Sequence, residues 1–290
     1  MFFLQLVISG AAVGSIYGLV GVGYSITFAT LKVLNFSQGQ FVMLGAMVGL
    51  TLHVWLGLNL LLAAVLTIAI LALLTIGIER ISVRPFLTGE SISWVLSTLA
   101  IGIIAENAAQ LIWGREALPF PAVFGDNPIR WAGVGVYPQE ILIIGASFLL
   151  MGVLELFYNR TLIGKALRAT AYDLDIASLM GINVGLMASM AFGMSSGLAA
   201  IAGILVAPIT LAEATMGGIL GLKAFAVAII GGLDSGRGIF ICGLAYGIFE
   251  SLCAGYIYTG IRDILGFFLV IVMLLIRPYG LFGRVEIEKV

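Results

Sequence analysis

Long apolar runs constrain the fold of this chain more than any other feature. Crossing a hydrocarbon core of ~30 Å takes about 20 helical residues, and backbone groups in lipid must find hydrogen bonds within their own segment. We therefore expect an all-α polytopic transmembrane bundle of about eight or nine spans, some of them broken, in a single domain over residues 1–290. The expected spans are 4–29, 39–57, 59–78, 91–113, 138–157, 184–211, 239–258 and 263–277.

Composition supports a membrane protein. Hydrophobic residues make up 61% of the 290 residues and charged ones only 10%, and the mean hydropathy is +1.16, far above soluble domains. A net charge of −1 gives no excess of positive charge to bind a polyanion, so no nucleic-acid partner is expected. Cys242 and Cys253 share one apolar run at a spacing typical of buried thiols, and no metal or cofactor is predicted.

A shorter apolar piece, 222–232, decides the topology. It is interrupted by Gly231 and Gly232, so it is either a ninth crossing or a half-helix covered by protein. If it crosses, with the N-terminus outside, ten of the fourteen basic residues lie on the cytoplasmic side, as the positive-inside rule favours. The ten are Lys32, Arg80, Arg84, Arg160, Lys165, Arg168, Arg237, Arg277, Arg284 and Lys289, against Arg115, Arg130, Lys223 and Arg262 outside. The C-terminus is then cytoplasmic.

Glycine recurs at intervals of four in several spans. The first span carries Gly10, Gly14 and Gly18, and the same spacing occurs at 193/197 and 243/247. Small residues at this interval allow close approach of helix backbones. The pattern predicts tight helix pairs and says nothing of transport by itself.

No pattern of an enzyme is present. The single histidine, His53, has no acidic residue in its helical turn, so no nucleophile has an evident base. The chain also lacks the G-x-x-x-x-G-K-[ST] loop that holds nucleotide phosphates. We expect a transport subunit whose ATP, if any, is handled by a partner.

Two sets of polar residues interrupt the apolar background. One is the break at 35–40, where Asn35, Ser37 and Gln38 either form a loop at the membrane face or begin a helix inside the protein beside a polar solute. The other is Glu106, with its neighbours Asn107 and Gln110, together with Glu250. These acids are either structural carboxyls, members of a proton relay or part of a solute pathway, and no basic residue is expected within the spans to pair with them.

Two connections between spans are long. The outer one, 114–137, carries three prolines among aromatic residues and either anchors at the membrane surface or receives a solute-binding protein. The inner one, 161–183, predicts a single short helix closed by Gly181. Its exposed charges are predicted to contact a soluble partner, the alternative being a plain interfacial helix; the candidate contact residues are Lys165, Arg168, Asp173, Asp175 and Gly181.

Several stretches resemble the permease subunits of branched-chain amino-acid ABC importers. Besides 161–183, which resembles their ATPase-contacting segment, these are 35–39, 224–238 and 277–283, reading NFSQG, AFAVAIIGGLDSGRG and RPYGLFG. Many members carry a histidine and an acid near the first stretch, where this chain has Gln38 and Gln40. The resemblance implies ATP-driven import of branched-chain or related amino acids. Because ribose or simple-sugar and urea or amide permeases are related, the alternative is the same machine with another small polar solute, and an ion-coupled secondary carrier is a further alternative.

The resemblance implies a machine of several chains. A second permease subunit, identical or different, two cytoplasmic ATPases and a periplasmic or surface solute-binding protein would complete an importer in the bacterial cytoplasmic (inner) membrane. The substrate pathway would include Asn35, Ser37, Gln38, Glu106 and Glu250. The resemblance also implies two roughly related halves, of which the sequence shows a faint echo in the spacing of Gly10 to Gly45 and Gly197 to Gly231.

Overall fold

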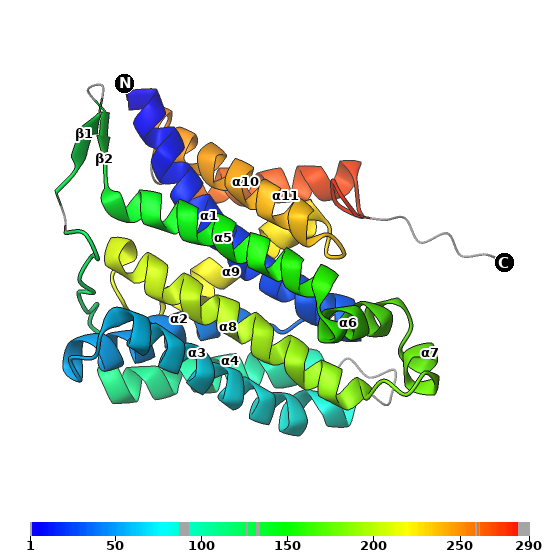
Figure 1. Cartoon of the computed structure of the whole chain (residues 1–290). Helices are drawn as coiled ribbons and strands as arrows, with labels where there is room; N and C mark the ends of the chain where they lie inside the picture. The colour runs from blue at the N-terminus through cyan, green and yellow to red at the C-terminus, as the bar shows by residue number, and fades with distance from the viewer. Residues whose placement is uncertain are drawn as a thin grey trace.

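The computed structural model is a bundle of helices with one small β-hairpin (Figure 1). It describes residues 2–86, 93–125, 127–131, 134–258, 260 and 262–283. The helices are α1 (Phe2–Leu31), α2 (Gln38–Leu50), α3 (Leu60–Ile78), α4 (Ser93–Trp113), α5 (Pro138–Arg160), α6 (Leu162–Tyr172), α7 (Leu174–Leu179), α8 (Val184–Thr210), α9 (Met216–Gly231), α10 (Gly236–Tyr256) and α11 (Arg262–Ile276). Strands β1 (Ile129–Trp131) and β2 (Val134–Val136) pair antiparallel.

The helices reproduce the predicted spans. Six of the described helices are long and apolar enough to cross a membrane, and α9 and α11 are shorter apolar helices. Helix α2 continues as a π-helical turn at Thr51–Trp55, so the two together have the length of a crossing. The prediction of an all-α polytopic bundle is confirmed. Residues 91 and 92 of one predicted span, and Arg284 and Lys289 of the orientation argument, lie outside the described residues.

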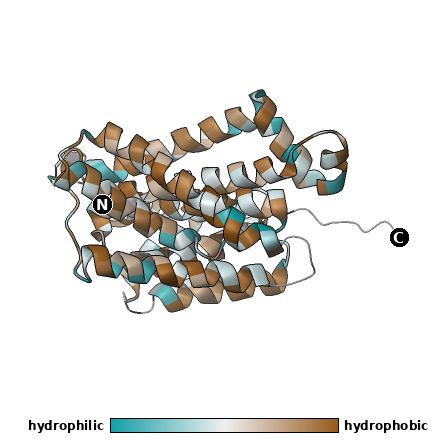
Figure 2. Ribbon diagram, turned by 90° about the horizontal axis from the view of Figure 1, so that it is seen from below, coloured by the Kyte–Doolittle hydropathy of each residue, from teal (hydrophilic) through white to brown (hydrophobic). Residues whose placement is uncertain are grey.

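The two ends of the bundle are different. Figure 1 shows the N-terminus and the β-hairpin at one end, here called the N-terminal end, and α6 and α7 at the other, the α7 end. Figure 2 shows brown, hydrophobic residues along most of the helices, with teal residues gathered mainly toward the ends. This distribution suits a protein whose two ends face water and whose middle lies in lipid.

Two long helices form the buried centre. In α1 and α8, 67% and 78% of the most apolar window lies inside the protein, compared with 11% in α5. Helix α1 packs on α9 and α10, and α8 packs on α2 and α3. The long first helix of each half, α1–α4 or α8–α11, thus packs on the second and third helices of the other half. Helices α1 and α8 run in opposite directions (Figure 1). This is the arrangement of an inverted repeat.

Glycines allow α1 and α10 to pack closely against each other. A Cβ on Gly14 would lie 2.5 Å from the carbonyl oxygen of Gly243, and one on Gly10 would lie 2.7 Å from Cα of Ile248. The α1 and α10 backbones are therefore in direct contact, as the four-residue spacing predicts. Gly193 and Gly197 are less crowded and face the side chains of α3.

Each half contains a break between a long helix and a short one. Helix α1 ends at Leu31 and is followed by Lys32 at φ 55°, while α8 ends at Thr210 and is followed by Leu211 at φ 66°. These are the non-glycine residues of positive φ among the described ones, and such backbone is costly for a residue with a Cβ. After its break the chain continues into α2 in the first half and into α9 in the second. These two helices cross near their beginnings, where a Cβ on Gly39 would lie only 2.7 Å from Cα of Gly221.

Candidate functional site

The break between α1 and α2 lies inside the protein. Asn35, Ser37 and Gln38 are all buried, so of the two interpretations of this stretch the structure has the interior helix start and not the loop at the membrane face. The Asn35 side-chain oxygen accepts hydrogen bonds from the Ser37 backbone nitrogen at 3.2 Å and from its hydroxyl at 2.6 Å. The amide thereby holds the turn that aims α2 into the bundle.

Gln38 ties three helices together. Its Nε2 donates to the backbone oxygen of Ser195 in α8 at 3.0 Å, and its Oε1 accepts from the Ser195 hydroxyl at 2.9 Å. The same hydroxyl lies 2.8 Å from the backbone oxygen of Gly23 in α1. Both polar groups of the Gln38 amide are therefore hydrogen-bonded within the protein, so this predicted pathway residue has a structural role. Its part in transport stays a prediction.

Gln40 connects the break to α4 and was missed as a candidate site residue. Its Nε2 donates to Oε2 of Glu106 at 3.1 Å, which places Glu106 beside the break; that the two line a solute pathway stays a prediction. The Gln40 Oε1 is buried and has no hydrogen-bond partner among the described residues, and a buried amide oxygen in that state is a site for water or a polar ligand. The sequence did contain a signal for Gln40, because it is a second glutamine in the polar run at 35–40.

A polar face of α4 leads from this pair to the N-terminal end. Gly102 lies beside Ser37 and Gln40, Asn107 is exposed on the helix surface, and Gln110 lines an open pocket of about 390 Å³ together with Arg115 and Thr215. From Gly102 to Gln110 is ~12 Å along the helix at 1.5 Å per residue. The face thus links a pocket at the bundle end to the buried break.

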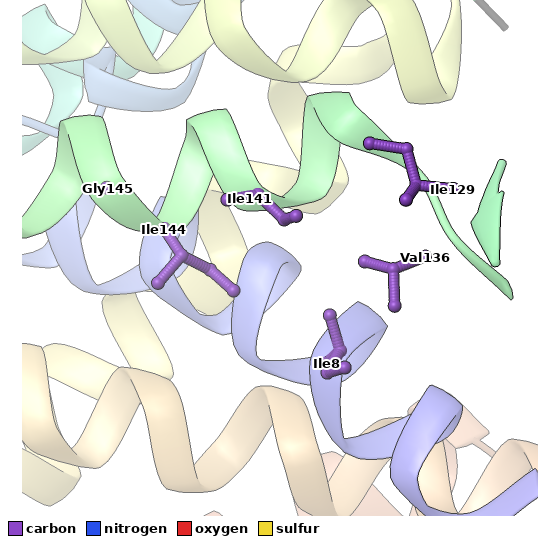
Figure 3. Close-up of a pocket in the computed structure, with 6 residues that line it drawn as sticks. All are labelled: Ile8, Ile129, Val136, Ile141, Ile144 and Gly145. Atoms are coloured by element: carbon purple, nitrogen blue, oxygen red, sulfur yellow. The ribbon is translucent and has the colours of Figure 1, made fainter. Parts of the chain in front are cut away.

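A second pocket is apolar. Figure 3 shows the side chains of Ile8, Ile129, Val136, Ile141 and Ile144 turned toward one space between α1, the hairpin and α5, with a volume of about 510 Å³. An amino acid there would lose the hydration of both its charged groups without any hydrogen bond in return, which is strongly unfavourable. Of the two pockets, the one at Gln110, Arg115 and Thr215 is the chemically suitable one for a polar solute.

Glu250 belongs to a different cluster, and here the sequence analysis was wrong. Lys223 was placed in an outer loop, and no basic residue was expected in the spans. The structure has Lys223 within α9, 4% exposed, in ion pairs with Glu250 of α10 and with Asp263 of α11, the latter at 2.7 Å. A buried carboxylate paired with a lysine is a structural link between helices, so the geometry does not bring Glu250 to the break.

Segment 161–183 contains two helices, and the prediction of one is wrong. The backbone of Asp173 is extended, α6 ends there and α7 begins. The Asp173 side chain accepts a hydrogen bond from the backbone nitrogen of Ile176 at 2.9 Å, as an N-cap does. Asp173 is therefore a capping residue as well as a charge. Lys165, Arg168 and Asp175 are exposed, and Arg168 donates to the Asn159 side chain at 2.6 Å.

Gly181 ends α7 as predicted. Its φ is +84°, its nitrogen donates to the backbone oxygen of Ser178, and the nitrogen of Ile182 donates to that of Ala177, both at 3.0 Å. This is the hydrogen-bond pattern of a Schellman motif, which glycine accommodates without strain. The chain then enters α8 through Asn183, which caps Leu186 at 3.0 Å.

Comparison with known proteins identifies the family. Residues 6–276 match the protein family described as "Branched-chain amino acid transport system / permease component". The chain is 32% identical to the high-affinity branched-chain amino acid transport system permease protein BraD of Pseudomonas aeruginosa, over 99% of this chain and 98% of that one. It is 31% identical to the permease protein LivH of Escherichia coli K12, over 100% and 98%. The chain belongs to this permease family.

The match covers each of the sites described above. A more distant archaeal relative, the probable branched-chain amino acid transport permease protein LivH of Methanocaldococcus jannaschii, is 27% identical over 96% of this chain and 92% of its own. The buried break, the polar face of α4, the Lys223 cluster and α6–α7 all lie within residues 6–276 of the permease, and the match ends with α11. The described residues contain no group of three or more side chains suited to a metal ion.

Proposed function

We propose that this permease is the membrane-spanning subunit of an ATP-driven importer of branched-chain amino acids in the bacterial cytoplasmic membrane. The full-length similarity to permeases of branched-chain amino-acid transport systems carries the proposal. The importer would contain a second permease subunit, identical or different, two cytoplasmic ATPases and a periplasmic or surface solute-binding protein. The ATPases are needed because the sequence has no phosphate-binding loop of its own.

The polar face of α4 is the part of the permease that would line the solute path. Arg115 and Thr215 at the pocket offer donors to a carboxylate, and Gln110, Asn107 and the Glu106–Gln40 pair continue inward to Asn35 and Ser37. Mostly uncharged groups suit a path because their desolvation costs less than that of charges and they do not hold a zwitterion too tightly. The unpartnered Oε1 of Gln40 supports this role for the inner end.

The second permease subunit would cover this face. Asn107 is exposed on a helix otherwise suited to lipid, with its Nδ2 bonded only back to Ile103 at 2.8 Å among the contacts that the structure gives it. An exposed amide within a span is unfavourable against hydrocarbon, so it should face water or protein. A path shared by two permeases satisfies this requirement.

The α6–α7 segment would receive an ATPase. Tyr172, Leu179 and Met180 are 90%, 87% and 79% exposed, and the charges of Lys165, Arg168 and Asp175 lie around them. A patch of apolar residues with a charged rim is the usual anatomy of a protein interface. Its place at one extreme end of the bundle (Figure 1), beyond the apolar spans, puts it within reach of a soluble partner.

Reconstitution tests the function. The permease is placed in proteoliposomes with its ATPases, its binding protein and radiolabelled leucine, with ATP inside. We expect uptake that requires ATP, survives collapse of the proton gradient and is not competed by ribose or urea. Uptake driven by a proton gradient without ATPases would overturn the proposal, and competition by ribose or urea would correct the cargo.

Thiol labelling tests the path. Asn107→Cys and Ile112→Cys form a matched pair, because both lie exposed on α4 and Ile112, 65% exposed, lies about 140° around the helix from Asn107. We expect a small water-soluble maleimide to modify the first variant in the assembled importer and to spare the second, because thiolate forms only in water. Equal labelling of both sites, or of neither, would contradict a water-filled path along the Asn107 face.

A further inference from the structure

An ionic network around one buried carboxylate joins the end of α3 to the beginning of α8. The Glu79 carboxylate is 0% exposed and accepts from Nε and Nη2 of Arg84, each at 3.0 Å, and from the Ser189 hydroxyl at 2.8 Å. The same Nη2 lies 2.9 Å from the Ser189 oxygen and 2.6 Å from the backbone oxygen of Gly185. A bidentate arginine–carboxylate pair fixes direction as well as distance.

The network occupies an unusual stretch of backbone. Glu79 to Val83 form a π-helical turn at the end of α3, and Arg84–Phe86 continue as a 3-10 turn. Such turns in a helix often occur at functional sites. On the α8 side a Cβ on Gly185 would lie 3.2 Å from the Arg84 guanidinium, so the guanidinium rests directly on the first turn of α8.

One side of the network is tied rigidly to α7. Only three residues separate Gly181, the closed end of α7, from Gly185, and within them Asn183 caps α8. With the Schellman hydrogen bonds on one side and the cap on the other, this short link leaves α7 little freedom relative to α8. A displacement of α7 must therefore reach the first turn of α8.

The other side leads to the buried break. Val83, at the end of the π-helical turn, belongs to an apolar cluster with Val33 of the break and Phe192 of α8, and Trp94 of α4 packs against it. Trp94 in turn stacks on Phe36, with ring centroids 6.5 Å apart. Contacts thus run without interruption from α7 to residues next to Asn35 and Ser37.

We propose that Glu79, Arg84 and Ser189 form a clamp that makes α7, the first turn of α8 and the end of α3 move as one body. Through it, displacement of α6–α7 by an ATPase reaches α4 and the break between α1 and α2. The three are positioning residues and touch no solute. This inference rests on the proposed function for its use in transport, but the rigid link itself does not depend on it.

Distance measurements test the link without any ATPase. Spin labels are placed at Ile81 and Met180, which are 77% and 79% exposed on the two sides of the clamp, and Cys242 and Cys253 are buried. Pulsed electron paramagnetic resonance should give one narrow distance distribution, broadened in Glu79→Gln/Arg84→Gln and less so in Ser189→Ala. The control is Glu155→Gln/Arg237→Gln, an ion pair between the partly exposed Glu155 of α5 and the exposed Arg237 of α10, and this variant should leave the distribution narrow. An unchanged width in the double variant would overturn the clamp.

Coupling is then measured as leucine taken up per ATP hydrolysed. The double variant should retain its ATPases on purification and hydrolyse ATP, while uptake per ATP falls about fivefold or more, the low end of typical allosteric coupling. Arg84→Lys keeps the positive charge but loses the bidentate hydrogen bonding of the guanidinium, so we expect an intermediate ratio of leucine uptake to ATP hydrolysis. Should the double variant fail to insert into the membrane, this milder variant provides the test. A wild-type ratio in Arg84→Lys and Ser189→Ala would show that the network is structural only. Failure of the wild type itself to use ATP would contradict the proposed function and leave the distance result standing.

Discussion

At the scale of single residues, burial in the bilayer makes each charge depend on its partner. Lys223 and Glu250 lie in neighbouring helices, 4% and 1% exposed, and Lys223 also lies over the ring of Tyr17 at 5.9 Å from its centroid. Removing one member of such a pair leaves the other charged in a medium that solvates it poorly. Asp263 is different, because 58% of its side chain is exposed.

Lys223→Met should therefore lower the free energy of unfolding by about 3–5 kcal/mol, the usual cost of breaking a buried ion pair. Lys223→Met/Glu250→Met removes both charges and should recover most of the loss. Thermal unfolding of the detergent-solubilised permease measures both. Asp263→Asn serves as control and should cost far less. If the double variant were as unstable as the single one, packing and not charge would explain the loss.

At the scale of helices, contact between glycine backbones sets the distance between α1 and α10. Gly10, Gly14 and Gly18 face the Phe240–Ser251 part of α10. At Gly14 the three nearest neighbours of a new methyl group would all be backbone atoms, which cannot rotate away. Overpacking in a well-packed interior typically costs about 1–3 kcal/mol and more where nothing can yield. The same glycine on a lipid-facing helix surface has no such constraint.

Gly14→Val should therefore separate the two helices, and Gly152→Val in α5, where a Cβ would have no neighbour within 4 Å, should be nearly neutral. The measurement is the fraction of each variant that stays monodisperse in size-exclusion chromatography after graded heating. We expect a clear drop in midpoint for Gly14→Val alone. Similar midpoints for the two variants would mean that the α1–α10 contact can open without loss.

At the scale of the whole molecule, the two ends of the bundle must face opposite sides of the membrane. The N-terminal end carries the pocket at Arg115, and the α7 end carries Lys165 and Arg168. Because basic residues concentrate at the α7 end, the positive-inside rule predicts that this end faces the cytoplasm. The inverted packing of α1–α4 against α8–α11 brings the beginnings of α2 and α9 together beside the two breaks.

This orientation predicts a simple labelling pattern. In intact cells an impermeant maleimide should modify Glu116→Cys, at the N-terminal end, and should reach Lys165→Cys in α6 only after permeabilisation. Both positions are exposed, and the unmodified permease with its buried Cys242 and Cys253 is the blank. The reverse pattern would invert the topology, and labelling of both sites from outside would contradict a separation by the membrane.

The sequence by itself determined the spans, because the bilayer requires long apolar helices whatever their neighbours are. It also predicted the helix stop at Gly181 and close packing of the glycine stripe of α1, though not that its partner is α10, since a left-handed residue and a small-residue stripe are local patterns. Only the tertiary structure decided that Glu106 meets Gln40, that Lys223 lies inside α9 beside Glu250, and that Glu79 holds Arg84 and Ser189. Those partners lie 27 to 110 positions apart, except for Glu79 and Arg84, and nothing in local hydropathy or periodicity says which distant side chain will satisfy a buried polar group. The helix start at Asp173 was missed although its signal is local, since the side chain accepts from the nitrogen three residues on, as an Asp N-cap commonly does.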